Sequence, residues 1–425
     1  MSQETSVDSM IGKVLFNRFK INGKLGEGSF GAVYLVQEGS EMFAMKCEDV
    51  DSDQKLLESE AEFLNYLKGG KVPYVKYYGT TNGKHILIME LMGKCLEDLL
   101  ESLPSKRMSI RCVCNIGIQI LDILEYIHDK HIIHRDIKPE NFVLGSGVNG
   151  RFVYILDFGL AKKYRSSKTL QHYPMTNSKR LTGTARYASI NALKGYSQSR
   201  RDDLEAVGYM LMYFLKGKLP WQGLQAKHRD ERYQKIMLKK QSTSPEELCS
   251  GFPNQFTEYI KYTRSLGYED NPNYNYLKGL LISALTTEGF QFDYYYDWNA
   301  NCNVNNNQYY KYNNMIPSKQ INLGSMNTPF GTKPRDENVN YVNEGLNSNN
   351  LHRFNSKNPF SVEPNPNIMG KDFNFNCAQP RIGFRRGRNK TNENGEQNLP
   401  NNINNNVNDM NGRQNNESGA CCIIM

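Results

Sequence analysis

Hydrophobic residues recur with two different spacings between about Phe19 and Trp298. Alternating β-branched and aromatic residues predict strands over residues 32–36 and 43–46, and the apolar run over residues 86–92 predicts a buried strand. Helical spacing of apolar residues is found over residues 56–67 and again from Ile110 to Leu124. The pattern therefore predicts a strand-rich beginning that is followed by a long amphipathic helix.

The apolar periodicity fades after Trp298, where asparagine dominates, as in residues 305–307 and 401–406. A segment of this composition cannot bury enough apolar surface to offset the entropy lost on ordering, so it is predicted to be disordered. The 425 residues also exceed what a single compact core holds. Two lobes, or a domain with a tail, are therefore expected.

Charge and cysteine content exclude several classes of protein. The formal net charge of +8 is modest for this length and suits acidic or phosphorylated substrates better than nucleic acid, so no nucleic-acid partner is expected. The nine cysteines have no zinc-ligand spacing and no secretory signal precedes them, which favours a reduced protein in the cytoplasm, with the nucleus as an alternative. The sequence contains no run of about 18 apolar residues, so no segment is predicted to span a membrane.

The most informative motif lies at residues 134–141, His-Arg-Asp-Ile-Lys-Pro-Glu-Asn, with an Asp-Phe-Gly tripeptide beginning at Asp157. Together they supply the carboxylate, ammonium, amide and second carboxylate that phosphoryl transfer from ATP needs. Asp136 is predicted to orient a substrate hydroxyl and accept its proton, and Lys138 to reach the transferred phosphate. Asn141 and Asp157 offer the oxygen ligands that Mg²⁺ prefers. The pattern predicts a protein kinase with ATP and Mg²⁺ as cofactors.

Gly26, Gly28 and Gly31 form a Gly-x-Gly-x-x-Gly pattern, which occurs in dinucleotide-binding folds as well as in kinases. In a dinucleotide fold the last glycine opens a helix, whereas here residues 32–36 are predicted to form a strand. The loop is therefore predicted to be a hairpin that covers phosphates. Lys46, in the next predicted strand, would hold the α- and β-phosphates as a point charge.

A lysine in this role needs a carboxylate partner, and the predicted helix over residues 56–67 contains three candidates. Glu60 lies among the apolar positions of that helix and is the predicted partner of Lys46. Glu58 and Glu62 are the alternatives, and both fit a solvated helix face.

The predicted strand over residues 86–92 would run into a hinge between two lobes. Met89 would border the adenine ring, or serve as a core residue, and the backbone of Glu90 and Met92 would form hydrogen bonds with adenine. The residues predicted to bind ATP are Leu25, Gly26, Gly28, Gly31, Val33, Ala44, Lys46, Met89, Glu90 and Met92.

The segment after the Asp-Phe-Gly motif narrows the class. Where most kinases have Ala-Pro-Glu, this chain has Ser-Ile-Asn at residues 189–191, within Leu-Thr-Gly-Thr-Ala-Arg-Tyr-Ala-Ser-Ile-Asn. Four strings strongly resemble the casein kinase 1 family: this one, residues 199–205, residues 219–224 and the closing Tyr-Tyr-Tyr-Asp-Trp-Asn. The resemblance runs from about Phe19 to Trp298. The resemblance implies a bilobal α+β protein kinase fold with a β-rich N-lobe and a helical C-lobe.

The resemblance also implies how substrates are chosen. The family phosphorylates Ser or Thr and favours sites with a phosphorylated or acidic residue upstream, so such proteins are the expected partners. Lys179, Arg186, Gly223 and Arg232 are on positions that resemble the family's anion pocket, where arginine at 232 replaces a common lysine. The chain lacks the glutamate of Ala-Pro-Glu, which implies a different anchoring of the activation segment. As in the family, the kinase is expected to be active without phosphorylation of that segment. Asp203 matches the helix acid that braces the catalytic loop.

The chain ends in Cys-Cys-Ile-Ile-Met, so Cys422 heads a prenylation box whose final methionine favours farnesyl transfer. One lipid binds membranes only reversibly, and Cys421 would add palmitoylation as a second anchor. The basic residues at 385–390 would attract anionic lipids, or form a solvated charge run. These features predict the cytoplasmic face of membranes, with the plasma membrane favoured. The tripeptide Asn358-Pro359-Phe360 resembles the motif that EH-domain adaptors bind.

The chain is thus divided into an N-terminal extension (1–18), a kinase domain (19–298), a disordered Asn-rich tail (299–420) and a lipidation box (421–425). Two other functions compete with an active kinase. A pseudokinase scaffold would recruit partners through the tail, but the complete set of motif residues argues against it. A tail that binds nucleic acid would depend on its arginine cluster.

Overall fold

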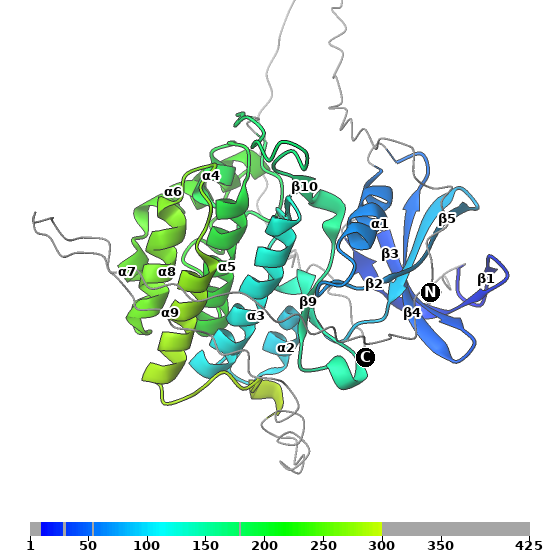
Figure 1. Ribbon diagram of the computed structural model, residues 1–425, viewed down its shortest axis with the longest axis horizontal. Helices are drawn as coiled ribbons and strands as arrows, with labels where there is room; N and C mark the ends of the chain where they lie inside the picture. The colour runs from blue at the N-terminus through cyan, green and yellow to red at the C-terminus, as the bar shows by residue number, and fades with distance from the viewer. Residues whose placement is uncertain (1–9, 29–30, 53–54, 178–179, 300–425) are drawn as a thin grey trace, which may run out of the picture. The chain divides into compact units, whose positions relative to one another are not determined.

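Six strands of the first lobe form one antiparallel sheet in the order β1-β2-β3-β4-β6-β5 (Figure 1). The computed structural model describes residues 10–28, 31–52, 55–177 and 180–299. The strands are β1 (Val14–Leu15), β2 (Phe19–Gly28), β3 (Gly31–Glu38), β4 (Glu41–Asp49), β5 (Val75–Thr81) and β6 (Lys84–Glu90). The predicted strands over residues 32–36 and 43–46 are confirmed, and both belong to long hairpins.

The period of two along β4 decides which side chains face the site. Phe43 and Met45 are buried in a cluster on one face of the sheet, with Ile86 and Ile88 of β6. Ala44 lies on the opposite face and packs on the core that continues into the second lobe. Lys46, two residues after Ala44, points to that same face, so the sheet directs its ammonium toward the interface of the lobes.

Helix α1 (Leu56–Tyr66) covers this face of the sheet. Its buried side chains are Leu57, Glu60, Ala61, Phe63 and Leu64, which follow the helical spacing predicted for residues 56–67. A glutamate thus lies within the apolar stripe. Because a buried carboxylate is costly without a partner, its position calls for an ionic or hydrogen-bonding contact.

The second lobe is helical. Its helices are α2 (Leu96–Ser102), α3 (Ile110–Asp129), α4 (Ile190–Leu193), α5 (Arg200–Lys216), α6 (Arg229–Ser242), α7 (Pro245–Leu248), α8 (Asn254–Ser265) and α9 (Tyr274–Thr287). Helix α3 packs against both α5 and α9, and fourteen of its residues are buried, so it forms the centre of this lobe (Figure 1). Two short antiparallel pairs, β7 (Ile132–Ile133) with β10 (Lys162–Lys163) and β8 (Phe142–Leu144) with β9 (Val153–Ile155), carry the loops between the lobes.

The predicted α+β architecture, with a strand-rich first lobe and a helical second lobe, is confirmed. The strand predicted over residues 86–92 ends earlier, at Glu90. There the chain leaves the sheet, and the amide of Gly93 donates to the carbonyl of Leu144 in the second lobe. The segment after α9 packs on the same lobe, since the Tyr296 hydroxyl accepts a hydrogen bond of 2.8 Å from Gln119 Nε2.

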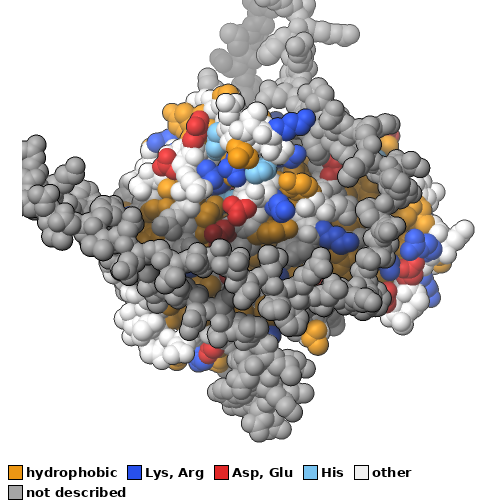
Figure 2. All heavy atoms as spheres, in the orientation of Figure 1, with side chains coloured by type: hydrophobic (Ala, Val, Ile, Leu, Met, Phe, Trp, Pro, Cys, Tyr) orange, Lys and Arg blue, Asp and Glu red, His pale blue; other side chains and the backbone are white. Residues whose placement is uncertain are grey.

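The surface of the described residues carries charges of both signs. On the face shown in Figure 2, Lys and Arg side chains lie interspersed with Asp and Glu side chains. None of the described helices is long and apolar enough to cross a membrane. Four predicted features lie outside the described residues: the tail, the 358–360 tripeptide, the basic residues at 385–390, and the cysteines at 421 and 422.

Two helical glycines give a matched test of this packing. A Cβ on Gly117 of α3 would lie 2.7 Å from Leu281 Cδ1 and 3.2 Å from Leu211 Cδ2, both on buried side chains, whereas a Cβ on Gly279 of α9 meets nothing within 4 Å. We predict that Gly279→Ala stabilises the fold by about 0.5–1 kcal/mol through helix propensity. In Gly117→Ala an overpacking cost of about 1–3 kcal/mol should outweigh that gain. Thermal unfolding should place the two variants on opposite sides of the wild type, and equal midpoints would contradict the packing.

Candidate active site

Asp136 is held from three sides at the interface of the lobes. Its Oδ1 accepts a hydrogen bond of 2.7 Å from the Thr184 hydroxyl, and its Oδ2 lies 2.7 Å from Lys138 Nζ. Asn141 Nδ2 donates to the backbone carbonyl of Asp136 at 2.9 Å. The residue is only 5% exposed. The carboxylate is therefore fixed in one orientation, with a cation beside it.

The backbone that carries Asp136 is fixed by Asp203 from helix α5. The Asp203 carboxylate accepts hydrogen bonds from the amides of His134 and Arg135, at 2.8 and 2.9 Å, and lies 3.0 Å from His128 Nε2. Burial alone would raise the pKa of Asp203, but the contacts with His128 and His134 outweigh it and the pKa is lowered. Arg135 has a positive φ of 70°, and these hydrogen bonds hold the loop in that unfavourable conformation.

Lys138 lies between two carboxylates. Burial alone would lower its pKa, but the charges of Asp136 and Asp157 outweigh that effect and raise it. The side chain is therefore a permanent cation, placed where negative charge would enter the site.

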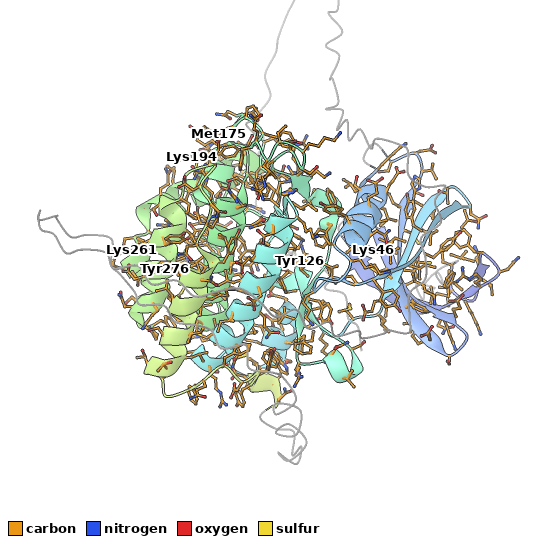
Figure 3. The ribbon with its side chains drawn as sticks, in the orientation of Figure 1. Lys46, Tyr126, Met175, Lys194, Lys261 and Tyr276 are labelled. Atoms are coloured by element: carbon orange, nitrogen blue, oxygen red, sulfur yellow. The ribbon has the colours of Figure 1, made fainter. Side chains whose placement is uncertain are left out.

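Lys46, which is labelled in Figure 3, is on β4. Its ammonium contacts the carboxylate of Glu60 on helix α1. Its Nζ lies 2.7 Å from Glu60 Oε1 and 3.0 Å from Oε2, and Glu60 is 1% exposed. Burial raises the pKa of Glu60, and the ammonium of Lys46 opposes this shift. Of the three glutamates considered for this pairing, Glu60 is the one in contact with Lys46, while Glu58 and Glu62 are exposed.

Asp157 completes the group of charges. Its Oδ1 lies 3.9 Å from Lys46 Nζ, and this buried oxygen has no hydrogen-bond partner among the described residues. The residue is in the left-handed region, at φ 66° and ψ 73°, which turns its side chain out of the strand direction. The preceding residue, Leu156, donates its amide to the carbonyl of Asn141 at 2.8 Å, so the two segments are adjacent. A buried oxygen without a donor among the described residues fits a hard cation such as Mg²⁺.

The described residues contain no group of three or more His, Cys, Asp or Glu side chains that could hold a metal ion alone. Mg²⁺ usually binds through one or two protein oxygens together with water and substrate phosphates. Asp157 and Asn141 would supply the protein oxygens here.

The predicted adenine-binding residues lie where the sheet meets the hinge. Ala44 pairs with Met89 across β4 and β6, and Val33 pairs with Lys46 across β3 and β4. All three apolar side chains are about 4% exposed. The amide of Glu90 donates to the carbonyl of Tyr74, so a contact between adenine and the Glu90 backbone must use its carbonyl.

The glycine-rich turn joins β2 and β3 as an antiparallel hairpin, in which Gly28 pairs with Gly31. Leu25 and Gly26 are in β2. Gly31 has φ 145°, and a Cβ there would lie 2.5 Å from the carbonyl of Cys47. The predicted hairpin is therefore present, and its last glycine is required by close contact with β4.

The activation segment lies directly on the catalytic loop. Gly183 has φ 96°, and a Cβ there would be 2.2 Å from the carbonyl of Arg135. Ser189, the first residue of the Ser-Ile-Asn string, donates to Asp202 Oδ1 at 2.5 Å, and the amide of Ile190 donates to Glu205 Oε1 at 3.1 Å. Acids of helix α5 thus anchor this segment without the glutamate that is usual in Ala-Pro-Glu.

The structure describes three of the four residues predicted to form the anion pocket. Lys179 lies outside the described residues. Arg186 is half-buried, with its guanidinium 5.6 Å from the ring centres of both Tyr187 and Tyr213. Gly223 has φ 74°, and Arg232 is on helix α6. The ring contacts hold Arg186 inward, so its part in an anion pocket stays a prediction.

Sequence patterns did not indicate two groups of this site. Thr184 is the hydroxyl donor to Asp136, and only its place in the resembling string could have drawn attention to it. Glu97 of α2 accepts a hydrogen bond from the Tyr213 hydroxyl at 2.9 Å, while its Oε2 is buried without a hydrogen-bond partner among the described residues. Burial, with the nearby charge of Glu140, raises the pKa of Glu97 to about 7.

This shift predicts a pH-dependent stability. The unfolded Glu97 titrates near its ordinary value of about 4.3, so between that pH and about 7 the folded state binds more protons. Raising the pH through this window therefore destabilises the fold. In Glu97→Gln this contribution disappears, so the variant should gain roughly 1–3 kcal/mol relative to wild type between pH 5 and pH 8. Urea unfolding at both pH values measures it, and a difference that is independent of pH would refute the assignment.

A family comparison covers the segment that carries all of these groups. The family model for the protein kinase domain matches residues 19–270, which is more than half of the chain. The match begins at the first residue of β2 and ends before α9. It includes the lysine and glutamate that pair across β4 and α1, the catalytic loop and the activation segment. A match of this extent shows that the chain belongs to the protein kinase family.

Proposed function

We propose that this kinase transfers the γ-phosphoryl group of ATP to Ser or Thr residues of proteins. The observation that carries the proposal is the fixed Asp136 carboxylate, which lies between the Thr184 hydroxyl and the Lys138 ammonium. A pseudokinase scaffold would have no need to keep this carboxylate, the Lys46–Glu60 pair and Asp157 all in place.

The groups divide the chemistry among them. Asp136 orients the substrate hydroxyl and accepts its proton, while Thr184 keeps the carboxylate turned toward it. Lys138 neutralises charge on the phosphate in transfer, and Lys46, held by Glu60, positions the ATP phosphates. Mg²⁺, bound through Asp157 and Asn141, would supply further charge neutralisation. Since the reaction needs little covalent work from the protein, positions and charges decide its rate.

A casein kinase 1 type of enzyme is the more specific proposal. The Ser-Ile-Asn string and its anchoring by Asp202 and Glu205 support it, because the activation segment is held without a phosphate group. Activity without activation-segment phosphorylation follows from this anchoring. A preference for phosphorylated or acidic residues upstream of the target would depend on Arg186 and Arg232, with Lys179 and Gly223 beside them.

The location is also a proposal. Lipids on Cys421 and Cys422 would tether the kinase to the cytoplasmic face of membranes, and mass spectrometry of the native C-terminal peptide would show whether they are attached. An EH-domain adaptor would be a partner through residues 358–360.

The proposed activity is tested by Asp136→Asn. Asparagine keeps the size of the side chain but cannot accept the proton, so phosphate transfer from ATP to a Ser peptide should fall by about 10²–10⁴-fold. Thr184→Val should cause a smaller loss of phosphate transfer, since it keeps the carboxylate and removes only its hydroxyl donor. Thermal unfolding controls for folding. Full turnover by folded Asp136→Asn would contradict the proposed role, and an inactive wild type would favour the scaffold.

The choice of substrate is tested by changing Arg186 and Arg232 together to Ala. Charge-assisted hydrogen bonds are worth roughly 1.5–3 kcal/mol each, so kcat/KM for a peptide phosphorylated upstream of the target should fall at least about tenfold more than for an unphosphorylated one. Arg229→Ala, an exposed arginine of the same helix, is the control. Equal losses on both peptides would mean that these arginines only support the fold.

A further inference from the structure

Helix α6 carries a lysine that is completely buried. Lys240 is 0% exposed, whereas its neighbour Lys239 on the same helix is only partly buried. The Lys240 Nζ lies 4.6 Å from the ring centre of Tyr209 and 4.9 Å from that of Trp221, both of which are also buried. A buried ammonium costs several kcal/mol in desolvation, so its retention requires specific contacts.

Those contacts are with the backbone of the activation segment. Lys240 Nζ donates to the carbonyl of Ala185 at 3.0 Å and to that of Ala188 at 2.5 Å. Trp221 adds a third hydrogen bond, since its Nε1 donates to the carbonyl of Arg186 at 2.7 Å. Three of the four backbone carbonyls of residues 185–188 thus accept hydrogen bonds from side chains that follow helix α5 in the chain.

The lysine is itself held in place. Burial lowers its pKa, and the nearby Glu205 carboxylate opposes that shift. Glu205 accepts hydrogen bonds from the Tyr209 hydroxyl at 2.6 Å and from the amide of Ile190. Arg264 donates to the carbonyl of Lys240 at 3.3 Å. The tie to residues 185–188 therefore belongs to a buried polar network, not to a mobile surface side chain.

The stretch that Lys240 holds borders the reacting group. Thr184, the residue before it, donates to Asp136, and Ala188 lines a small cavity of about 10 Å³ together with Arg135 and Asp136. A Ser or Thr that reaches Asp136 brings chain on both sides of it. Residues 185–188 therefore lie along the path that a bound peptide has to take.

We infer that Lys240 is a positioning residue for the peptide substrate, which sets the backbone of residues 185–188 in the form that accepts the chain around the target hydroxyl. The inference rests on the proposed kinase activity and extends it to a residue that does not touch ATP or the reacting atoms. Lys240 thus adds to the anchoring that Asp202 and Glu205 give the activation segment in place of the Ala-Pro-Glu glutamate.

The test compares Lys240→Met with Lys239→Met. Methionine has a similar length and no donor, so the carbonyls of Ala185 and Ala188 lose their partner while the core stays filled. The loss of hydrogen bonds and the removal of a buried charge act in opposite directions on stability, so the unfolding midpoint should change little. KM for a Ser peptide should rise about tenfold or more in Lys240→Met, with the KM for ATP and the peptide-independent ATP hydrolysis unchanged. Lys239→Met should behave as wild type.

Amide hydrogen exchange over residues 181–192 gives a readout that needs no activity, and it should be at least about tenfold faster in Lys240→Met. If this variant does not fold, Trp221→Phe removes one donor to residues 185–188 and keeps a smaller aromatic ring in the core, so it should show a smaller change of the same kind. Unchanged exchange and unchanged peptide KM would overturn the inference. So would an equal fall in peptide transfer and ATP hydrolysis, which marks a purely structural role.

A wild type without phosphate transfer contradicts the proposed function, whereas the exchange result still decides the role of Lys240.

Discussion

The contact of the Asp203 carboxylate with the amides of His134 and Arg135 is the interaction on which the rest of the site depends. Asp203 is 2% exposed, and it comes from helix α5, which packs against the central helix α3 of the second lobe. Its two hydrogen bonds hold Arg135 at a positive φ. This backbone conformation decides where the next residue, Asp136, presents its carboxylate. A site whose rate depends on positions and charges needs such a rigid support, because misplacement of the reacting groups is costly.

The same helix supports a second layer of the site. Asp202 and Glu205, on either side of Asp203, hold Ser189 and Ile190, so one helical turn anchors both the catalytic loop and the activation segment. Lys240 and Trp221 complete this support from other parts of the lobe. The substitution of Ser-Ile-Asn for Ala-Pro-Glu therefore does not leave the segment loose. It moves the anchor from one ion pair to a set of hydrogen bonds with buried acids.

The sequence predicted those features in which neighbouring residues carry the chemistry. Asp136, Lys138 and Asn141 follow one another in one short loop, and Glu60 differs from the other two glutamates of its helix because it belongs to the apolar stripe. Lys240 could not be found in this way, since a Lys-Lys pair on a polar helix resembles a solvated face, and only packing against Tyr209 and Trp221 buries one of the two. Arg186 shows the opposite limit, because a resemblance gives its position in the chain but not its contacts with two tyrosine rings.

We expect Asp157, whose Oδ1 has no hydrogen-bond partner among the described residues, to form one site for Mg²⁺ and ATP together with the Lys46–Glu60 pair. Calorimetric titration with a non-hydrolysable ATP analogue, with and without Mg²⁺, tests it most directly on wild type and Asp157→Asn. Mg²⁺ should strengthen binding to the wild type at least about tenfold, which is 1.4 kcal/mol, and should have little effect in the variant. An equal effect of Mg²⁺ on both proteins, or no binding of the analogue by the wild type, would contradict this account.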